Sequence, residues 1–135
     1  MKFRIDSAGG VASHVRIGEH ELRFDQPPSF GGGDTGPSPL DVMVATVGAC
    51  AHYYAAAFLQ ARKLPVDRLS VVVEAEKTTA GAHRIKRLSV VVVLPPGLPE
   101  ELLPRVERAV RGCPAWGTLV DAPELSMTVI PFGAE

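Results

Sequence analysis

The first part of the chain alternates apolar and polar residues in three short runs, residues 2–6, 11–17 and 21–25, which glycine-containing turns separate. Alternation with a period of two is typical of strands that bury one face. We therefore expect an antiparallel meander of three strands. Residues 26–39 contain several prolines and glycines and no periodic apolar pattern, so they predict a loop.

A long helix is predicted directly after this loop. Ser38 is a suitable N-cap, Pro39 suits the first helical position, and Asp41 follows at the spacing that completes a capping box. Residues 40–64 then carry apolar side chains around most of the helix circumference, which is typical of a helix buried on more than one side. The rest of the chain is too short to cover such a helix, so we expect a second copy to cover it in an obligate homodimer.

The second half of the chain predicts a hairpin, a helix and a final strand. Residues 69–78 and 84–95 are rich in valine and are joined by a short turn, which indicates two paired strands. A helix is expected between Pro99 and Gly112, and residues 125–131 predict the last strand. This order of elements is that of an α+β fold.

The length and charge of the chain indicate how many domains it has and which kinds of binding partner its composition does not favour. The chain has 135 residues, which fit one domain over residues 1–135, and a formal net charge of -1. Acidic and basic residues are interleaved, so the charge pattern favours neither a nucleic-acid nor a membrane partner. The N-terminus resembles no targeting peptide, and we expect no membrane-spanning run and a cytoplasmic location.

The chemistry is expected at the two cysteines, Cys50 and Cys113, which are the only ones in the chain. In the cytoplasm, a cysteine pair is more often catalytic, redox-sensing or metal-binding than a structural bridge. None of the four histidines has a ligand-like spacing to either cysteine. We therefore expect neither a metal nor another cofactor, and a dithiol reaction is the favoured chemistry.

The two cysteines differ in their predicted surroundings. Cys113 precedes Pro114, so it is expected to be the N-cap of a short helix whose free amides and positive dipole end favour a thiolate. Cys50 lies in the middle of the long helix among apolar neighbours, and His52 points to another face. By these features alone, a buried structural cysteine is an equally good interpretation of Cys50.

The order and spacing of several short motifs resemble those of the OsmC/Ohr superfamily, the osmotically inducible protein C and organic hydroperoxide resistance proteins. The matching motifs run along nearly the whole chain: Gly31 to Gly33, Gly36 to Asp41, Gly48 to Cys50, the Leu-Pro-Val turn at Leu64, Arg84-Ile85, the helix after Leu98 to Glu101, and Gly112 to Pro114 followed by Thr118-Leu119.

The resemblance implies an intertwined α+β homodimer, with antiparallel sheets, long central helices and two sites at the subunit interface. It also implies a thiol-dependent peroxidase that reduces organic hydroperoxides. In that chemistry Cys50 is oxidised to a sulfenic acid, Cys113 condenses with it to a disulfide, and an external dithiol restores both thiols. Asp41 is the acidic residue nearest to the position where a family branch carries a catalytic glutamate, and capping is its favoured role.

Two departures separate this chain from the hydroperoxide-resistance branch. Val11 stands where that branch has an arginine that supports the thiolate, and Leu40 stands in place of its glutamate. The chain is therefore more similar to the general OsmC-like branch. The alternative function is a non-enzymatic dimer that binds an apolar small molecule or senses oxidants, and a purely structural dimer is the least favoured.

Overall fold

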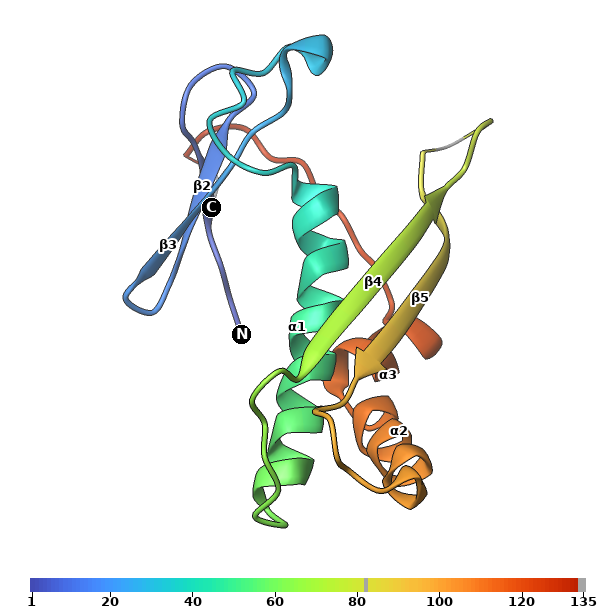
Figure 1. Cartoon of the computed structure of the whole chain (residues 1–135). Helices are drawn as coiled ribbons and strands as arrows, with labels where there is room; N and C mark the ends of the chain where they lie inside the picture. Colours follow the sequence, from blue (N-terminus) through green and yellow to red (C-terminus); the bar gives the residue numbers. More distant parts are fainter. Residues whose placement is uncertain (82, 134–135) are drawn as a thin grey trace.

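The computed structural model describes residues 1–81 and 83–133, and it shows the expected α+β architecture (Figure 1). Its elements are, in order, β1 (Ile5–Ser7), β2 (Ser13–Ile17), β3 (His20–Phe24), the 3-10 turn η1 (Pro28–Phe30), α1 (Pro39–Gln60), β4 (Ser70–Lys77), β5 (Ile85–Val93), the 3-10 turn η2 (Glu100–Leu102), α2 (Leu103–Arg111) and α3 (Pro114–Val120).

The strands form two separate antiparallel sheets. One is the meander β1-β2-β3, in which Val15 of β2 lies opposite Leu22 of β3, and the other is the hairpin β4-β5, in which Val72 lies opposite Val91. In Figure 1 the long helix α1 runs between the meander and the hairpin. The predicted meander and the predicted hairpin are both confirmed.

Helix α1 ends at Gln60, four residues before the predicted end at residue 64. Lys63 adopts a left-handed conformation with a φ of 56°, and the Leu64 N–H donates to the carbonyl of Leu59 at 3.0 Å. This is the usual geometry of a helix end. Pro65 disfavours a helical conformation at the residue before it, so the helix has to stop upstream of the proline.

The core lies where α1 meets the hairpin and α2. Its buried members are Ala51, Ala55, Leu59, Leu69, Val106 and Val110. Gly48 marks the closest approach of α1 to β4, because a Cβ atom at this position would lie 2.5 Å from Cγ2 of Val73. The glycine therefore allows the helix to rest directly on the strand.

Only one side of α1 is buried within the chain. Tyr53 is 65% exposed and Met43 is 46% exposed. With 22 residues and a mean hydropathy of 1.5 over its apolar window, α1 is long and apolar enough to span a membrane, contrary to the expectation that no run reaches this length. One such helix is weak evidence for a span, since core helices of soluble proteins meet the same criteria.

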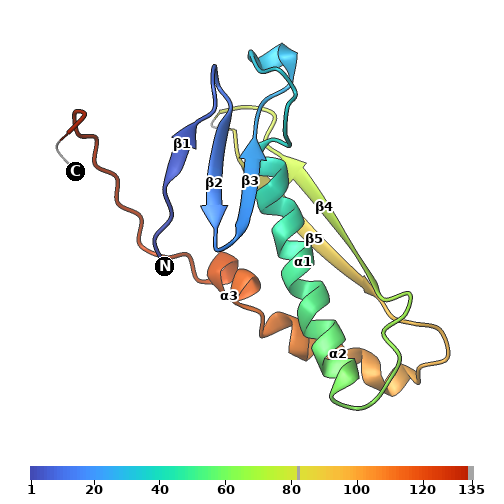
Figure 2. The same cartoon turned by 90° about the vertical axis from the view of Figure 1, so that its left-hand side faces the viewer.

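The predicted last strand, residues 125–131, does not form. The segment is extended but pairs with no described strand. In Figure 2 the chain after α3 is drawn without a strand arrow. Leu125, Met127 and Val129 are 88%, 91% and 89% exposed. A strand needs the free edge of a neighbouring strand, and the described part of this chain pairs no edge with this segment.

Candidate functional site

Cys113 occupies the N-cap of α3, as its position before Pro114 predicts. Its Sγ accepts a hydrogen bond from the backbone N–H of Trp116 at 3.3 Å. The side chain is only 1% exposed. The thiol therefore lies at the end of the helix where free amides gather, but out of contact with bulk water.

Cys50 lies on the side of α1 that faces this helix terminus. Its side chain lies close enough to Cys113 to influence the pKa of that thiol. Cys50 is partly exposed, and both residues are free thiols. The structure thus brings together two cysteines that lie far apart in the sequence, as we expected.

Burial raises the pKa of the Cys113 thiol above its ordinary value, because the thiolate would lose the solvation that water provides. The Trp116 N–H opposes this effect, and the neighbouring Cys50 thiol adds to it. The position of Cys113 at the helix N-terminus, taken alone, predicts a lowered thiol pKa. Desolvation outweighs it here, so Cys113 is held as a neutral thiol.

Asp41 lies away from the cysteines. Asp41 and Cys50 are nine residues apart, about two and a half turns, so they project from opposite sides of α1. The Asp41 N–H donates to Ser38 Oγ at 3.2 Å, and the Ser38 hydroxyl donates to Asp41 Oδ2 at 2.7 Å. These bonds form the predicted cap. Within one chain, the carboxylate does not reach the thiols.

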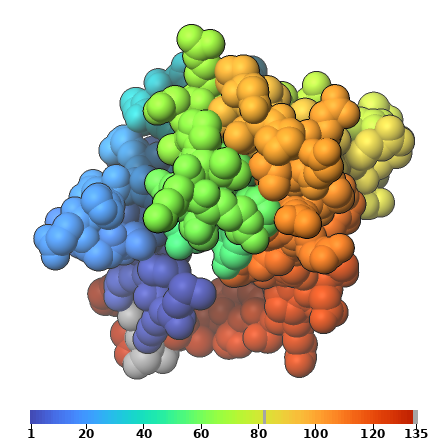
Figure 3. Space-filling model, turned by 60° about the horizontal axis from the view of Figure 1, so that its bottom comes forward, coloured from blue at the N-terminus to red at the C-terminus, as the bar shows by residue number. Residues whose placement is uncertain are grey.

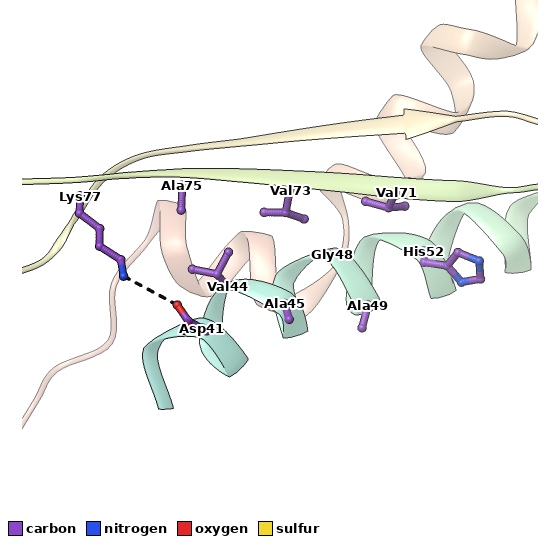
Figure 4. A pocket seen from close by; sticks show the side chains of 10 residues that line it. All are labelled: Asp41, Val44, Ala45, Gly48, Ala49, His52, Val71, Val73, Ala75 and Lys77. Atoms are coloured by element: carbon purple, nitrogen blue, oxygen red, sulfur yellow. Dashed lines mark ion pairs between the residues drawn. The ribbon is translucent and has the colours of Figure 1, made fainter. Parts of the chain in front are cut away.

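Asp41 also borders a groove of about 580 Å³ between α1 and β4 (Figure 4). Small apolar side chains such as Ala45 and Val73 line the groove, His52 lies toward one end, and Asp41 forms an ion pair of 3.8 Å with Lys77 at the other. His52 therefore faces this groove and not the cysteines, as its position two residues after Cys50 predicts.

The positions of the two departures carry no group that could support a thiolate. Val11 is 54% exposed in the turn between β1 and β2. Arg111 is the arginine nearest to Cys113 in the sequence. Its guanidinium forms an ion pair with Glu107 at 2.8 Å and lies 5.1 Å from the centre of the Trp116 ring.

In residues 1–81 and 83–133, no group of three or more His, Cys, Asp or Glu could hold a metal ion.

One polar residue of structural importance escaped the sequence analysis. The Asp25 carboxylate is 3% exposed and accepts hydrogen bonds from Gln26 N, Gly33 N, Thr35 N and Thr35 Oγ1 at 2.6–3.1 Å. These bonds, that of the Thr35 hydroxyl above all, hold the pKa of Asp25 far below its ordinary value. An Asp at the start of a glycine- and proline-rich loop is the signal that could have revealed it.

Comparison with known proteins places the chain in a family. The sequence matches the model of the family described as OsmC-like protein over residues 31–128, a span that includes both cysteines. A comparison with curated proteins finds no match.

Several solved structures share the fold. A protein of Psychrobacter arcticus, described as an osmotic stress induced and detoxification response protein, has a TM-score of 0.77 at 12% identity over 87% of each chain. The OsmC-like protein of Mycoplasma pneumoniae has a TM-score of 0.69 at 17% identity, over 90% of this chain and 89% of that chain. The organic hydroperoxide resistance protein of Bacillus subtilis has a TM-score of 0.59 at 20% identity, over 90% of this chain and 93% of that chain.

At these identities, the structural likeness shows a shared fold. The family model spans most of the chain, and it includes the helix of Cys50 as well as the Cys113 cap. The chain therefore belongs to the OsmC-like family.

Proposed function

We propose that the protein is a thiol-dependent peroxidase that reduces organic hydroperoxides through Cys50 and Cys113. The observation that carries this proposal is the meeting of two free thiols with different exposure at one place in the fold. A buried structural cysteine would explain either residue alone. It does not explain why two cysteines from distant segments lie close to each other.

The different surroundings favour Cys50 as the attacking thiol and Cys113 as the resolving one. Cys50 is the more exposed of the two cysteines, whereas the buried Cys113 keeps its proton. As a thiolate, Cys50 would attack the distal peroxide oxygen, so that an S–O bond forms, the O–O bond breaks and the leaving alkoxide takes up a proton to become the alcohol. Cys50 is then a sulfenic acid.

In the proposed cycle, Cys113 is the resolving thiol. Its sulfur would attack the Cys50 sulfur, the S–S bond would form, and the hydroxide released from the sulfenic acid would leave as water with the Cys113 proton. An external dithiol would then reduce the disulfide by thiol–disulfide exchange. The family's bulky, apolar hydroperoxides suit this site better than hydrogen peroxide, because apolar side chains dominate α1.

Thiol counting tests this cycle directly. One equivalent of cumene hydroperoxide per reduced chain should remove both free thiols and produce a disulfide within the chain, detected by thiol titration and by a mass loss of two hydrogen atoms. Cys50→Ser should abolish peroxide consumption. Cys113→Ser should leave a sulfenic acid on Cys50 that dimedone traps, and should fail only on turnover.

Asp41→Asn is the matched variant for the proposed roles. Because Asp41 faces away from Cys50 and caps α1, the variant should lower stability by a few tenths to about 1 kcal/mol while Cys50 is labelled at the wild-type rate. Slower labelling at unchanged stability would instead give Asp41 a catalytic role. Dimedone labelling of Cys113 in the Cys50→Ser protein at the wild-type rate would reverse the two roles.

The groove between α1 and β4 supports a second candidate function. Its volume of about 580 Å³ and its valine and alanine lining suit an apolar small molecule, and neither cysteine lines it. If neither cysteine is labelled at millimolar hydroperoxide, a non-enzymatic protein that binds such a ligand becomes the better interpretation.

A further inference from the structure

Three arginines from two helices surround one hollow at the end of the molecule opposite the η1 loop. Arg62 follows the last turn of α1, and Arg105 and Arg108 lie one turn apart on α2. With Phe58 and Ala109 they line a hollow of about 380 Å³. Figure 3 views the molecule from this end, where the end of α1 and the following loop, in green, lie beside α2, in orange.

The positive charge of this hollow is not neutralised within the described residues. No carboxylate lines the hollow, and none of the three arginines forms an ion pair with a described residue. Elsewhere on the surface, arginines do find partners: Arg87 pairs with Glu76 at 3.6 Å and Arg111 with Glu107 at 2.8 Å. Three like charges around one space repel one another, so an anion between them would be favoured.

Arg62 is held in place before any ligand arrives. Its guanidinium lies 3.6 Å from the centre of the Phe58 ring, and its Nη1 donates to the Phe58 carbonyl at 3.0 Å. The ring and the carbonyl restrict a side chain that would otherwise lose rotamer freedom on binding. The other N–H groups of the guanidinium remain available to a ligand. Their planar arrangement matches the oxygens of phosphate and carboxylate groups.

We propose that this hollow binds a small polyanion, a ligand whose phosphate or carboxylate oxygens carry about three negative charges in total. A total charge of about three balances the three guanidinium groups, whereas a monoanion would leave most of the repulsion between the arginines uncompensated. The hollow is too small for a nucleic acid, and the chain has no broad basic field, with a formal net charge of -1. The site lies outside the cysteine pair and does not depend on the peroxidase cycle.

Calorimetric titration of the full-length protein with sodium pyrophosphate and, separately, with sodium citrate tests the proposal at constant ionic strength set with sodium chloride. We expect saturable binding of at least one of the two, and a melting temperature that rises with its concentration. The two titrations distinguish a phosphate-type from a carboxylate-type ligand. The Cys50→Ser protein should bind equally well, which separates this test from that of the peroxidase.

Charge-removing variants locate the site. Arg105→Gln and Arg108→Gln should each weaken binding about tenfold, because each removes a charged pair of donors while glutamine keeps a good helix propensity. Arg16→Gln, at an exposed position of β2, removes the same charge elsewhere and should change the affinity less than twofold. Circular dichroism checks that the variants fold.

Three results would overturn the proposal. One is the absence of saturable binding by either probe. Another is an equal loss of affinity in Arg16→Gln, which would indicate a general charge effect. The third is unchanged binding in both α2 variants, which would place the ligand at another site.

Discussion

The two cysteines show how strongly the surroundings of a single atom control its chemistry. Both are thiols, but Cys113 is 1% exposed and Cys50 is partly exposed, and burial raises the pKa of Cys113. The Trp116 N–H at 3.3 Å is not enough to reverse this effect. The exposure of each cysteine, rather than its position on a helix, therefore supports the division of roles that we propose.

Gly48 is a second position at which one atom matters. Gly48→Ala should lower the free energy of unfolding by about 1 kcal/mol, because crowding against Val73 costs about 1–3 kcal/mol and the better helix propensity of alanine returns about 1. Urea denaturation measures the change.

Gly117→Ala is the matched control, since it makes the same change in helix α3 with nothing within 4 Å of the new Cβ. It should leave stability unchanged or raise it by up to about 1 kcal/mol. Equal effects of the two substitutions would show that α1 does not depend on close contact with β4.

Among the larger parts of the fold, the loop between β3 and α1 is held together by one carboxylate. Asp25 accepts bonds from both ends of the loop, and the Arg23 side chain donates to Thr35 Oγ1 at 3.0 Å. Gly32 also lies so close to the Gln26 carbonyl that no side chain would fit there. The loop therefore has a defined conformation, fixed by these hydrogen bonds, and it leads into the N-cap of α1.

This arrangement predicts a pH dependence of stability. The folded-state pKa of Asp25 lies far below its ordinary value of 3.8, so the ionised carboxylate stabilises the fold above that pH. This contribution is lost as the pH falls below about 3.8 toward the folded-state pKa. Asp25→Asn should be less stable than the wild type at pH 7, and the difference should shrink as the pH falls below 4.

Urea denaturation between pH 7 and pH 3 measures both effects. Asp34→Asn removes an exposed carboxylate from the same loop at a φ of 54°, which asparagine tolerates, and it should behave like the wild type. A constant difference between Asp25→Asn and the wild type over this pH range would contradict the prediction.

For the molecule as a whole, the exposed apolar surface is the feature that the fold leaves unexplained. One side of α1 is open, with Tyr53 65% exposed, and the segment after α3 exposes Leu125, Met127 and Val129 almost completely. A soluble monomer rarely leaves this many large apolar side chains uncovered. We propose that a second copy covers it in a homodimer.

Sedimentation at low micromolar concentration should therefore give about twice the mass of one chain. Tyr53→Glu should shift the protein toward monomer, because it places a charge on the open side of α1, and removal of residues 122–135 should also weaken association. A wild-type protein that is monomeric and stably folded at this concentration would contradict the dimer. Thiol titration and dimedone labelling test the peroxidase chemistry separately from this result.

Some features of this protein follow from short-range rules and could be predicted from the sequence. Ser38 before Pro39 begins a helix, and Cys113 before Pro114 begins another, because capping involves only neighbouring residues. The meander formed where the alternation indicated it, and the hairpin formed where the valine-rich runs indicated it. Both cysteines were evident as the only two in the chain, and the structure brings them close together as expected.

Other features depend on which segments meet in space, and local patterns do not contain that information. The apolar alternation of residues 125–131 is typical of a strand, but a strand forms only beside an available edge, and no described strand pairs with this segment. Burial of Cys113 and the meeting of three arginines each require parts of the chain that are distant in sequence. Desolvation and charge–charge interactions depend on those distances, and folding alone sets them.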